Sequence, residues 1–282
     1  MCRDCGCQQA NERAHMKENL DSHSIADQMN ESEHKLNTEH WHDHWVEGKL
    51  VRHSHVIQSK DIVNGRSRKI ILEESILKKN DQIAKENRNW FKKNRIKVLN
   101  LISSPGSGKT LLLEKTVEFL KKKSPDFKMV ILTGDQEKDF DAQRLNAVGA
   151  DVLQLNTVNS CHLDASMIEK ELGRFVRPEH QLLIIENVGN LVCPAAFDLG
   201  ETQKVALLST TEGEDKPSKY PLLFHEAGLI VISKVDLIPY LDWSLELCQQ
   251  HIRSVNISAP ILKLSSKTGE GMEAWFEFLH TI

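Results

Sequence analysis

The sequence predicts an α/β protein in which a mostly parallel β-sheet is covered by helices on both faces and is preceded by a flexible tail. From about Ile96 onward, near-continuous apolar runs alternate with helical segments, which is the pattern of a sheet buried on both faces. A glycine-rich turn joins the first of these runs to a helix. Residues 1–65 differ from the rest, because they lack proline, contain few apolar runs and hold eight of the thirteen histidines.

Three segments are therefore expected along the chain. Residues 1–65 form a Cys- and His-containing tail, whose composition is typical of solvated disorder and whose histidines can still bind metal ions. Residues 66–95 form an amphipathic helix, and residues 96–282 form the α/β domain.

The expected helix is defined by apolar side chains that recur every seven residues. Two such sets occur, and their members are Ile76, Ile83, Trp90, Leu77, Ala84 and Phe91. The segment also contains ten Lys or Arg residues against four Asp or Glu residues. We expect the helix to dock on the domain that follows it and to leave its charged faces in solvent. A basic surface that binds a partner is the alternative.

Seven strands are expected in the α/β domain, each a short apolar run bounded by turn or helix signals. They cover residues 96–103, 128–133, 151–156, 181–187, 204–210, 228–234 and 260–265. The sequence ends on a predicted helix, GMEAWFEFLHTI.

The stretch SSPGSGKT follows the first strand and opens a helix, as a phosphate-binding loop requires. Gly106 and Gly108 allow backbone N–H groups to turn toward the phosphates, Lys109 reaches the β and γ oxygens, and the Thr110 hydroxyl is placed for Mg²⁺. One departure is that Ser103 stands where the usual motif has its first glycine. The expected nucleotide-binding residues of this loop are Pro105, Gly106, Ser107, Gly108, Lys109 and Thr110.

Two later segments favour guanine over adenine. SKVD follows a strand and resembles the N-K-x-D element of GTPases, in which Asp236 would accept hydrogen bonds from guanine and the Lys234 stem would cover the ring. Ser233 replaces the usual asparagine, which we expect to remove an amide brace but not the base-reading carboxylate. SSKTGEG resembles the remaining guanine-side loop and supplies Ser265, Ser266 and Lys267. GTP and GDP are thus the expected ligands of a P-loop GTPase domain.

Two carboxylates stand at strand ends on the nucleotide edge of the sheet, Asp135 in TGDQ and Glu186 in ENVGN. Together with Thr110 they are expected to hold Mg²⁺ and its water shell, while Gly189 meets the γ-phosphate through its backbone N–H. The expected catalytic residues are Lys109, Thr110, Asp135 and Glu186. No residue has the features of a strong general base, so we expect slow hydrolysis of GTP to GDP and phosphate.

A second candidate metal site consists of Cys161 and His162, which are adjacent in NSCHLD, and Cys193 in NLVCP. The pair falls in one loop, and Cys193 falls where the second switch of a GTPase should be, so a shared ion could sense the γ-phosphate. Three ligands leave a tetrahedral ion short, and a second subunit or an exogenous ligand could complete it. Buried structural side chains are the alternative.

The first seven residues, MCRDCGC, contain Cys2, Cys5 and Cys7. The sequence has no apolar run long enough to span a bilayer and no secretory signal, so a cytoplasmic location is expected, where clustered thiols are more often metal ligands than disulfides. Spacing alone favours zinc, whereas a nitrogen and sulfur plane would suit Ni²⁺. The net charge of −4 gives no electrostatic case for nucleic acid or an anionic membrane as the main partner.

Five segments together carry a family resemblance: SSPGSGKT, NSCHLDASMI, ENVGNLVCPAAFDLGE, LSTTEGEDKPSKYP and SKVDLIPYL. In this order they resemble the HypB family of hydrogenase nickel-incorporation GTPases, which is of the same class as the urease accessory GTPase. The resemblance covers about residues 66–282, and MCRDCGC is similar to the C-x-x-C-G-C start of that family.

The resemblance implies GTP hydrolysis coupled to nickel delivery into the [NiFe]-hydrogenase large-subunit precursor, a GTP-dependent homodimer and a partner nickel chaperone, HypA. It also implies a tight nickel site at Cys2, Cys5 and Cys7 and a weaker Ni²⁺ or Zn²⁺ site at Cys161, His162 and Cys193. Two alternatives are a nickel storage protein and a GTPase that serves another nickel enzyme such as urease. His40, His42 and His44 give the storage hypothesis some support.

Overall fold

The computed structural model describes residues 38–46, 49–57, 59–135, 140–157 and 160–282, with side chains described from Ser75 onward except that of Asp135. The chain divides into two compact units, Met1–Arg68 and Lys69–Ile282. The thiols predicted to bind nickel near the start of the chain, those of Cys2, Cys5 and Cys7, lie outside the described residues.

The first unit contains a β-hairpin within the stretch that was expected to be a tail. β1 (Thr38–Val46) pairs antiparallel with β2 (Lys49–Ile57). Two tryptophans, three valines and an isoleucine lie in this stretch, and these residue types favour strands. Helix α2 (Ser59–Asn94) follows and begins before the expected start of the amphipathic helix at residue 66. The tail was predicted from the histidine content and the absence of proline, and the strand preference of the tryptophan, valine and isoleucine residues was not considered.

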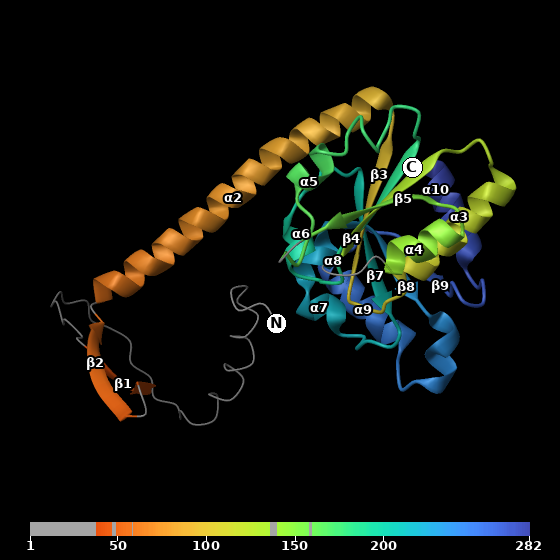
Figure 1. The fold of residues 1–282 in the computed structure, drawn as a ribbon. Coiled ribbons are helices and arrows are strands. Elements are labelled where there is room, and N and C mark those ends of the chain that lie inside the picture. Colours follow the sequence, from red (N-terminus) through yellow and green to blue (C-terminus); the bar gives the residue numbers. More distant parts are fainter. Residues whose placement is uncertain (1–37, 47–48, 58, 136–139, 158–159) are drawn as a thin grey trace. The chain divides into compact units, whose positions relative to one another are not determined.

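The second unit is built on a sheet of seven parallel strands in the order β5-β4-β6-β3-β7-β8-β9 (Figure 1). The strands are β3 (Lys97–Ser103), β4 (Met129–Asp135), β5 (Asp151–Asn156), β6 (Leu182–Glu186), β7 (Gln203–Ser209), β8 (Ala227–Ser233) and β9 (Ile261–Leu264). All seven predicted strands are confirmed, with small differences at their ends. β3 lies at the centre of the sheet, so its carboxyl end delivers the glycine-rich turn to the middle of the ligand-binding edge.

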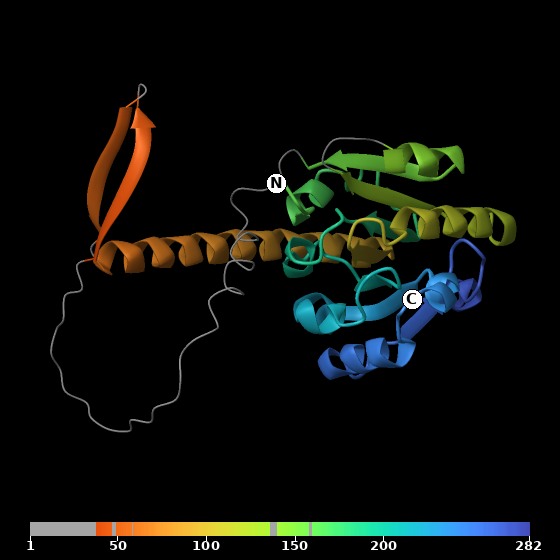
Figure 2. The ribbon, with the colours of Figure 1, turned by 90° about the horizontal axis from the view of Figure 1, so that it is seen from below.

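Helices cover both faces of this sheet (Figures 1 and 2). They are α3 (Lys109–Lys123), α4 (Phe140–Ala147), α5 (Ala165–Glu169), α6 (Cys193–Ala196), α7 (Lys216–Lys219), α8 (Pro221–Glu226), the 3₁₀-helix η2 (Val235–Tyr240), α9 (Leu245–Val255) and α10 (Met272–Thr281). α3, α4 and α10 pack on one face. α2, α5, α6, α8 and α9 pack on the other. The predicted parallel sheet with two helical layers is confirmed.

Alternation along β3 explains how one strand serves both layers. Leu99 and Leu101 belong to the core under α3 and α10, whereas Val98 and Ile102 belong to the cores on the opposite face. Successive side chains of a strand point to opposite faces, so a fully apolar strand is buried on both.

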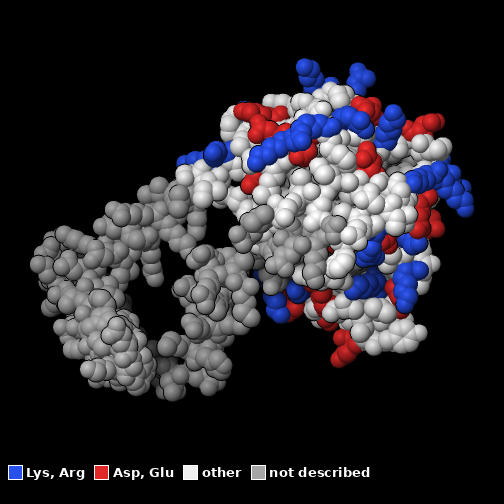
Figure 3. Space-filling model, viewed as in Figure 1, with Lys and Arg blue, Asp and Glu red and all other residues white. Residues whose placement is uncertain are grey.

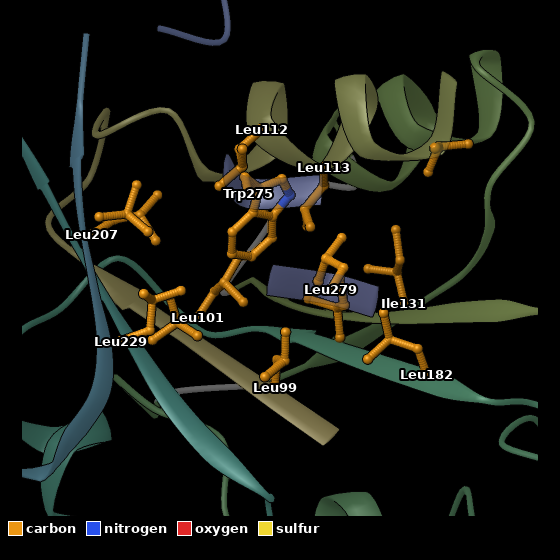
Figure 4. Close-up of a cluster of buried hydrophobic side chains, with 14 of the residues drawn as sticks. Leu99, Leu101, Leu112, Leu113, Ile131, Leu182, Leu207, Leu229, Trp275 and Leu279 are labelled. Atoms are coloured by element: carbon orange, nitrogen blue, oxygen red, sulfur yellow. The ribbon is translucent and has the colours of Figure 1, made fainter. Parts of the chain in front are cut away.

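Trp275 is the largest fully buried side chain of the core and comes from the predicted last helix. Its ring lies among Leu112 and Leu113 of α3 and the β3 leucines (Figure 4). Its indole Nε1 donates to Thr116 Oγ1 at 2.9 Å, so the one polar atom of the ring is satisfied. Truncation of such a side chain typically costs about 3–5 kcal/mol. Because Trp275 contacts both α3 and β3, it stabilises the position of α3, the helix that follows the glycine-rich turn.

The C-terminal part of α2 belongs to the second unit, where Phe91 packs in the core on one face of the sheet. Ala84 and Phe91 are buried, but Ile76 is 49% exposed, so the repeat marks the docked face only toward the helix end. The Asn87 amide donates to Ala165 O at 2.9 Å and to Leu199 O at 3.2 Å, and Arg88 pairs with both carboxylate oxygens of Asp198. α2 thus holds the start of α5 and the segment after α6.

Charged side chains of both signs are interspersed over the described face of the second unit (Figure 3). Among the described residues, no helix combines the length and the apolar character needed to cross a membrane.

Candidate functional site

The glycine-rich turn connects β3 directly to α3. Gly106 and Gly108 have φ of 73° and 96°, which is the left-handed region that glycine adopts at little cost. Gly108 caps the start of α3 and, being glycine, has no side chain that could hydrogen-bond to the N–H groups of the first turn. The first turn of a helix carries unpaired N–H groups and the positive end of the helix dipole, so this turn is suited to an anion such as a phosphate.

A cavity of about 490 Å³ opens over this turn and is lined by Pro105, Gly106, Ser107, Gly108, Lys109, Thr110 and Gly189 among others. Lys109 is only 8% exposed, and its Nζ donates to Ser103 Oγ at 2.8 Å. Burial lowers the pKa of Lys109, and the nearby Glu186 carboxylate opposes this effect. A buried ammonium that faces a cavity would be stabilised by the negative charge of bound phosphates.

Glu186 lies at the end of β6 and faces the same cavity. Its Oε1 accepts from Thr110 Oγ1 at 2.7 Å, while its buried Oε2 has no hydrogen-bond partner in the described structure. Burial raises the pKa of the carboxyl to about 7, although Lys109 and Thr110 act in the opposite direction. A carboxylate oxygen without a partner beside a threonine hydroxyl is a donor set that Mg²⁺ prefers, so these residues fit the ion.

Asp135, the other predicted Mg²⁺ residue, is the last residue of β4. In the register between β4 and β6, Thr133 lies opposite Glu186, so Asp135 is placed at the same edge of the sheet. Its side chain is not among those described. The backbone therefore brings Asp135 to the predicted edge, and its contact with Mg²⁺ stays a prediction.

The loop after β6 packs against the glycine-rich turn. A Cβ on Gly189 would lie 3.0 Å from the backbone Cα of Pro105. The two loops can therefore pack this closely without a backbone shift only if residue 189 is glycine. Two residues earlier, Asn187 Oδ1 accepts from the backbone N–H groups of Leu163 and Val188 at 3.2 and 3.0 Å. Since Leu163 follows His162, this amide joins the nucleotide-side loop to the loop of the second candidate metal site.

The predicted base-side residues follow β8 and β9. Lys234 has φ of 60°, and Asp236 lies in the first turn of η2. Ser265, Ser266 and Lys267 begin the turn after β9, where the Ser265 hydroxyl accepts from the backbone N–H groups of Lys267 and Thr268. Because β8 and β9 are neighbours, both segments lie at the same edge of the sheet, next to but outside the lining of the phosphate cavity.

Ser233, which stands where the usual motif has asparagine, makes a contact that the sequence did not predict. Ser233 Oγ donates to the backbone carbonyl of Ser107 at 2.7 Å and so connects the end of β8 to the glycine-rich turn. The shorter side chain reaches the carbonyl because Ser107 and Ser233 are both buried at this contact. The end of β8 is therefore held to the glycine-rich turn by a hydroxyl group, although the amide of the usual motif is absent.

The structure brings Cys161, His162 and Cys193 together at one place. The Sγ atoms of the two cysteines are 2.9 Å apart, and Cys161 Sγ lies 3.8 Å from His162 Nδ1. One ligand atom from each residue lies within 4.8 Å of the other two. Burial lowers the pKa of His162, opposed by Asp164, so the imidazole favours the neutral form that a metal requires. Two thiols and an imidazole suit Zn²⁺ or Ni²⁺.

Sequence reasoning missed several residues of the cavity. Asp141 and Arg144 of α4 and Gln154 of β5 line it, and Arg144 Nε also pairs with Glu114 at 2.8 Å. None of these stands in a motif, and they reach the cavity only because α4 and β5 fold back beside β4. Their positions depend on contacts distant in sequence, so no local signal was available.

Comparison with known proteins agrees with the fold and the cavity. Residues 97–263 match the family described as CobW/HypB/UreG, nucleotide-binding domain. Hydrogenase maturation factor HypB of Azotobacter vinelandii is 50% identical over 214 residues, covering 76% of this chain and 70% of that protein. The chain belongs to the HypB family. HypB of Escherichia coli strain K12 is 48% identical over 214 residues, covering 76% of this chain and 73% of that protein.

Solved HypB structures have the same fold. HypB of Archaeoglobus fulgidus has a TM-score of 0.67 and 38% identity, covering 73% of this chain and 98% of that one. HypB of Helicobacter pylori in complex with nickel has a TM-score of 0.66 and 38% identity, covering 72% of this chain and 94% of that one. The chain is thus a nucleotide-binding P-loop protein of the HypB hydrogenase maturation family.

Proposed function

We propose that this HypB protein is a GTP-hydrolysing nickel metallochaperone, which couples GTP binding and hydrolysis to nickel insertion into the [NiFe]-hydrogenase precursor. The observation that carries the proposal is the segment ENVGNLVC. It begins with Glu186 and Gly189 at the phosphate cavity and ends with Cys193 at the thiol and imidazole cluster. A change of this segment with the γ-phosphate would alter one ligand of the bound metal.

The residues predicted to bind phosphates and Mg²⁺ have distinct roles in this proposal. Lys109 and the N–H groups at the start of α3 bind the phosphates, and Lys109 offsets the charge that develops on the transferred group. Mg²⁺, held by Thr110 and Glu186 with Asp135, would supply further positive charge at the β and γ oxygens. Among the described residues lining the cavity, no histidine is present to act as general base. The proposed hydrolysis is accordingly slow, as suits a switch.

Base recognition and dimerisation are assigned to the segment after β8. Asp236 would read guanine, and the apolar side chains that follow are unusually exposed: Tyr240 is 84%, Leu241 38% and Leu247 41% exposed. We assign this surface to the GTP-dependent homodimer, because exposed apolar groups adjoining the base site would be covered only when the nucleotide orders the segment. HypA and the [NiFe]-hydrogenase large-subunit precursor are the further proposed partners, in the cytoplasm.

The cysteine and histidine cluster is proposed as the nucleotide-sensitive metal site. It would bind Ni²⁺ or Zn²⁺ through Cys161, His162 and Cys193 and leave a position open for a further ligand. Cys2, Cys5 and Cys7 are proposed as the tight nickel site.

Delivery to a urease is the second candidate function. A relative from Helicobacter hepaticus that is 39% identical is named hydrogenase/urease maturation factor HypB, and it covers 79% of this chain and 91% of its own length. This name favours a nickel client beyond hydrogenase for some members of the family.

One experiment tests delivery against storage. Nickel bound per chain would be counted by equilibrium dialysis, together with phosphate release from GTP, on the intact protein and on a version without residues 1–10. Delivery predicts one or two ions per chain, slow GTP turnover and loss of the tight ion on truncation. Many ions per chain, or no GTP turnover, would contradict the proposal.

A further inference from the structure

Glu212, in the loop after β7, makes a set of contacts to the glycine-rich turn that the nucleotide-binding motifs do not explain. Its Oε2 accepts from Ser104 Oγ at 2.6 Å, and its Oε1 lies 3.1 Å from Ser107 Oγ. The Ser107 hydroxyl shares its proton between this carboxylate and Ser104 O at 2.6 Å. Glu212 Oε1 also accepts from Ser209 N at 3.2 Å, so the carboxylate ties the turn to the end of β7.

The Glu212 carboxylate contacts the glycine-rich turn from outside the phosphate cavity. Its side chain is 14% exposed, and Glu212 is not among the described residues that line the phosphate cavity. Lys216 Nζ lies 3.3 Å from Glu212 Oε2 and 3.4 Å from Ser104 Oγ, which offsets the negative charge so close to a phosphate site. A half-buried, paired carboxylate with four polar neighbours holds its geometry better than an exposed one.

The same residue also contacts the base side. Trp243 Nε1 donates to the backbone carbonyl of Glu212 at 2.9 Å, and Trp243 lies between η2, which contains Asp236, and α9. One residue therefore connects the phosphate-binding turn, the end of β7 and the segment after the base-reading carboxylate.

We propose that Glu212 is a positioning residue for nucleotide binding. Its carboxylate holds the glycine-rich turn in the shape that receives phosphates and links that turn to the base-side segment. Glu212 touches neither the phosphates nor the reacting atoms, so its removal weakens ground-state and transition-state binding alike. The consequence is a raised KM for GTP with little change in kcat.

The test measures GDP affinity and dissociation rate with a fluorescent GDP derivative, well below the unfolding temperature of each variant. Glu212→Ala is expected to weaken binding about tenfold or more, mainly through faster dissociation, since hydrogen bonds to charged groups are the stronger kind. Glu212→Gln keeps an acceptor oxygen for Ser104 but cannot pair with Lys216, and an intermediate loss is expected. Glu214→Ala is the matched control in the same loop, because Glu214 accepts from Ser244 N at 3.4 Å and does not contact the glycine-rich turn within the described structure.

A double-mutant cycle shows whether Glu212 acts through the turn. In a Ser104→Ala, Ser107→Ala background, Glu212→Ala should add little further loss, because its hydrogen-bond donors there are already gone. Three results would overturn the inference: GDP affinity of Glu212→Ala within twofold of wild type, an undiminished effect in the serine background, or an equal loss in Glu214→Ala. Since wild type is measured alongside, a wild type that fails to bind GDP would instead refute the nucleotide assignment on which this inference rests.

Discussion

Glu186→Gln is expected to change the pH dependence of stability in the nucleotide-free protein. Burial raises the pKa of Glu186 to about 7 from the ordinary 4.5. Between these two values the folded chain holds a proton that the unfolded chain has lost, so the wild-type free energy of unfolding falls as pH rises through this window. Glutamine is neutral at every pH and can still accept from Thr110 Oγ1. The free energy of unfolding of the variant should therefore not fall in this pH window.

The magnitude follows from the two pKa values. Since one pKa unit is worth about 1.4 kcal/mol, ionising Glu186 costs the nucleotide-free fold roughly 3 kcal/mol at pH 8. Most of this cost, about 2.5 kcal/mol, arises between pH 5 and pH 8. Any fixed cost of placing the amide in the cavity is the same at both pH values and cancels in the comparison.

The assay is urea unfolding of both proteins at pH 5 and pH 8 without nucleotide or Mg²⁺. The stability of Glu186→Gln relative to wild type should rise by about 2–3 kcal/mol between the two pH values. Glu277→Gln, a change at an exposed position of α10, is the control and should show no such trend. If the stability difference between Glu186→Gln and wild type is the same at both pH values, Glu186 does not have a raised pKa in the folded protein.

Three further changes test the site. Lys109→Ala should abolish GTP hydrolysis measured by phosphate release and leave the circular dichroism spectrum unchanged, because its ammonium is the charge proposed to contact the β and γ oxygens. Unchanged turnover would refute the phosphate assignment. Asp236→Asn should shift preference from guanosine to xanthosine nucleotides in competition assays, whereas an equal loss of all nucleotides would make Asp236 structural. Asn187→Leu removes the acceptor shared by Leu163 and Val188, so metal affinity should lose its dependence on nucleotide state, while Asn187→Asp keeps that acceptor and should retain it.

The sheet and the phosphate turn were predictable because their signals are local. Each buried strand is a continuous apolar run, and SSPGSGKT carries its function in a fixed spacing between Ser103 and Thr110. Cys161, His162 and Cys193 were predicted to share an ion because the first two fall in one loop and Cys193 in the expected second-switch segment, and their ligand atoms lie within 4.8 Å of one another.

The features that sequence reasoning missed depend on contacts between distant residues. Asn187 and Glu212 stand in segments that carry the family resemblance, but their contacts arise only when β6 and β7 bring them beside β3. The contact of Ser233 with the Ser107 carbonyl was not predicted, because residue type gives the reach of a side chain but not which distant segment lies beside it. The hairpin Thr38–Ile57 was missed because composition was weighed over strand preference.

In the proposed mechanism, the nucleotide state sets metal affinity at Cys161, His162 and Cys193. The most direct measurement is titration with Ni²⁺ and with Zn²⁺ in the presence of GDP or a non-hydrolysable GTP analogue, on wild type and on Cys193→Ala. Wild type should differ between the two nucleotides by a coupling of about 1–3 kcal/mol, and nucleotide affinity should respond to metal by the same factor. Cys193→Ala should remove the coupling and leave binding at Cys2, Cys5 and Cys7 intact. Identical metal affinity in both nucleotide states of wild type would contradict the account and reduce the cluster to a static site.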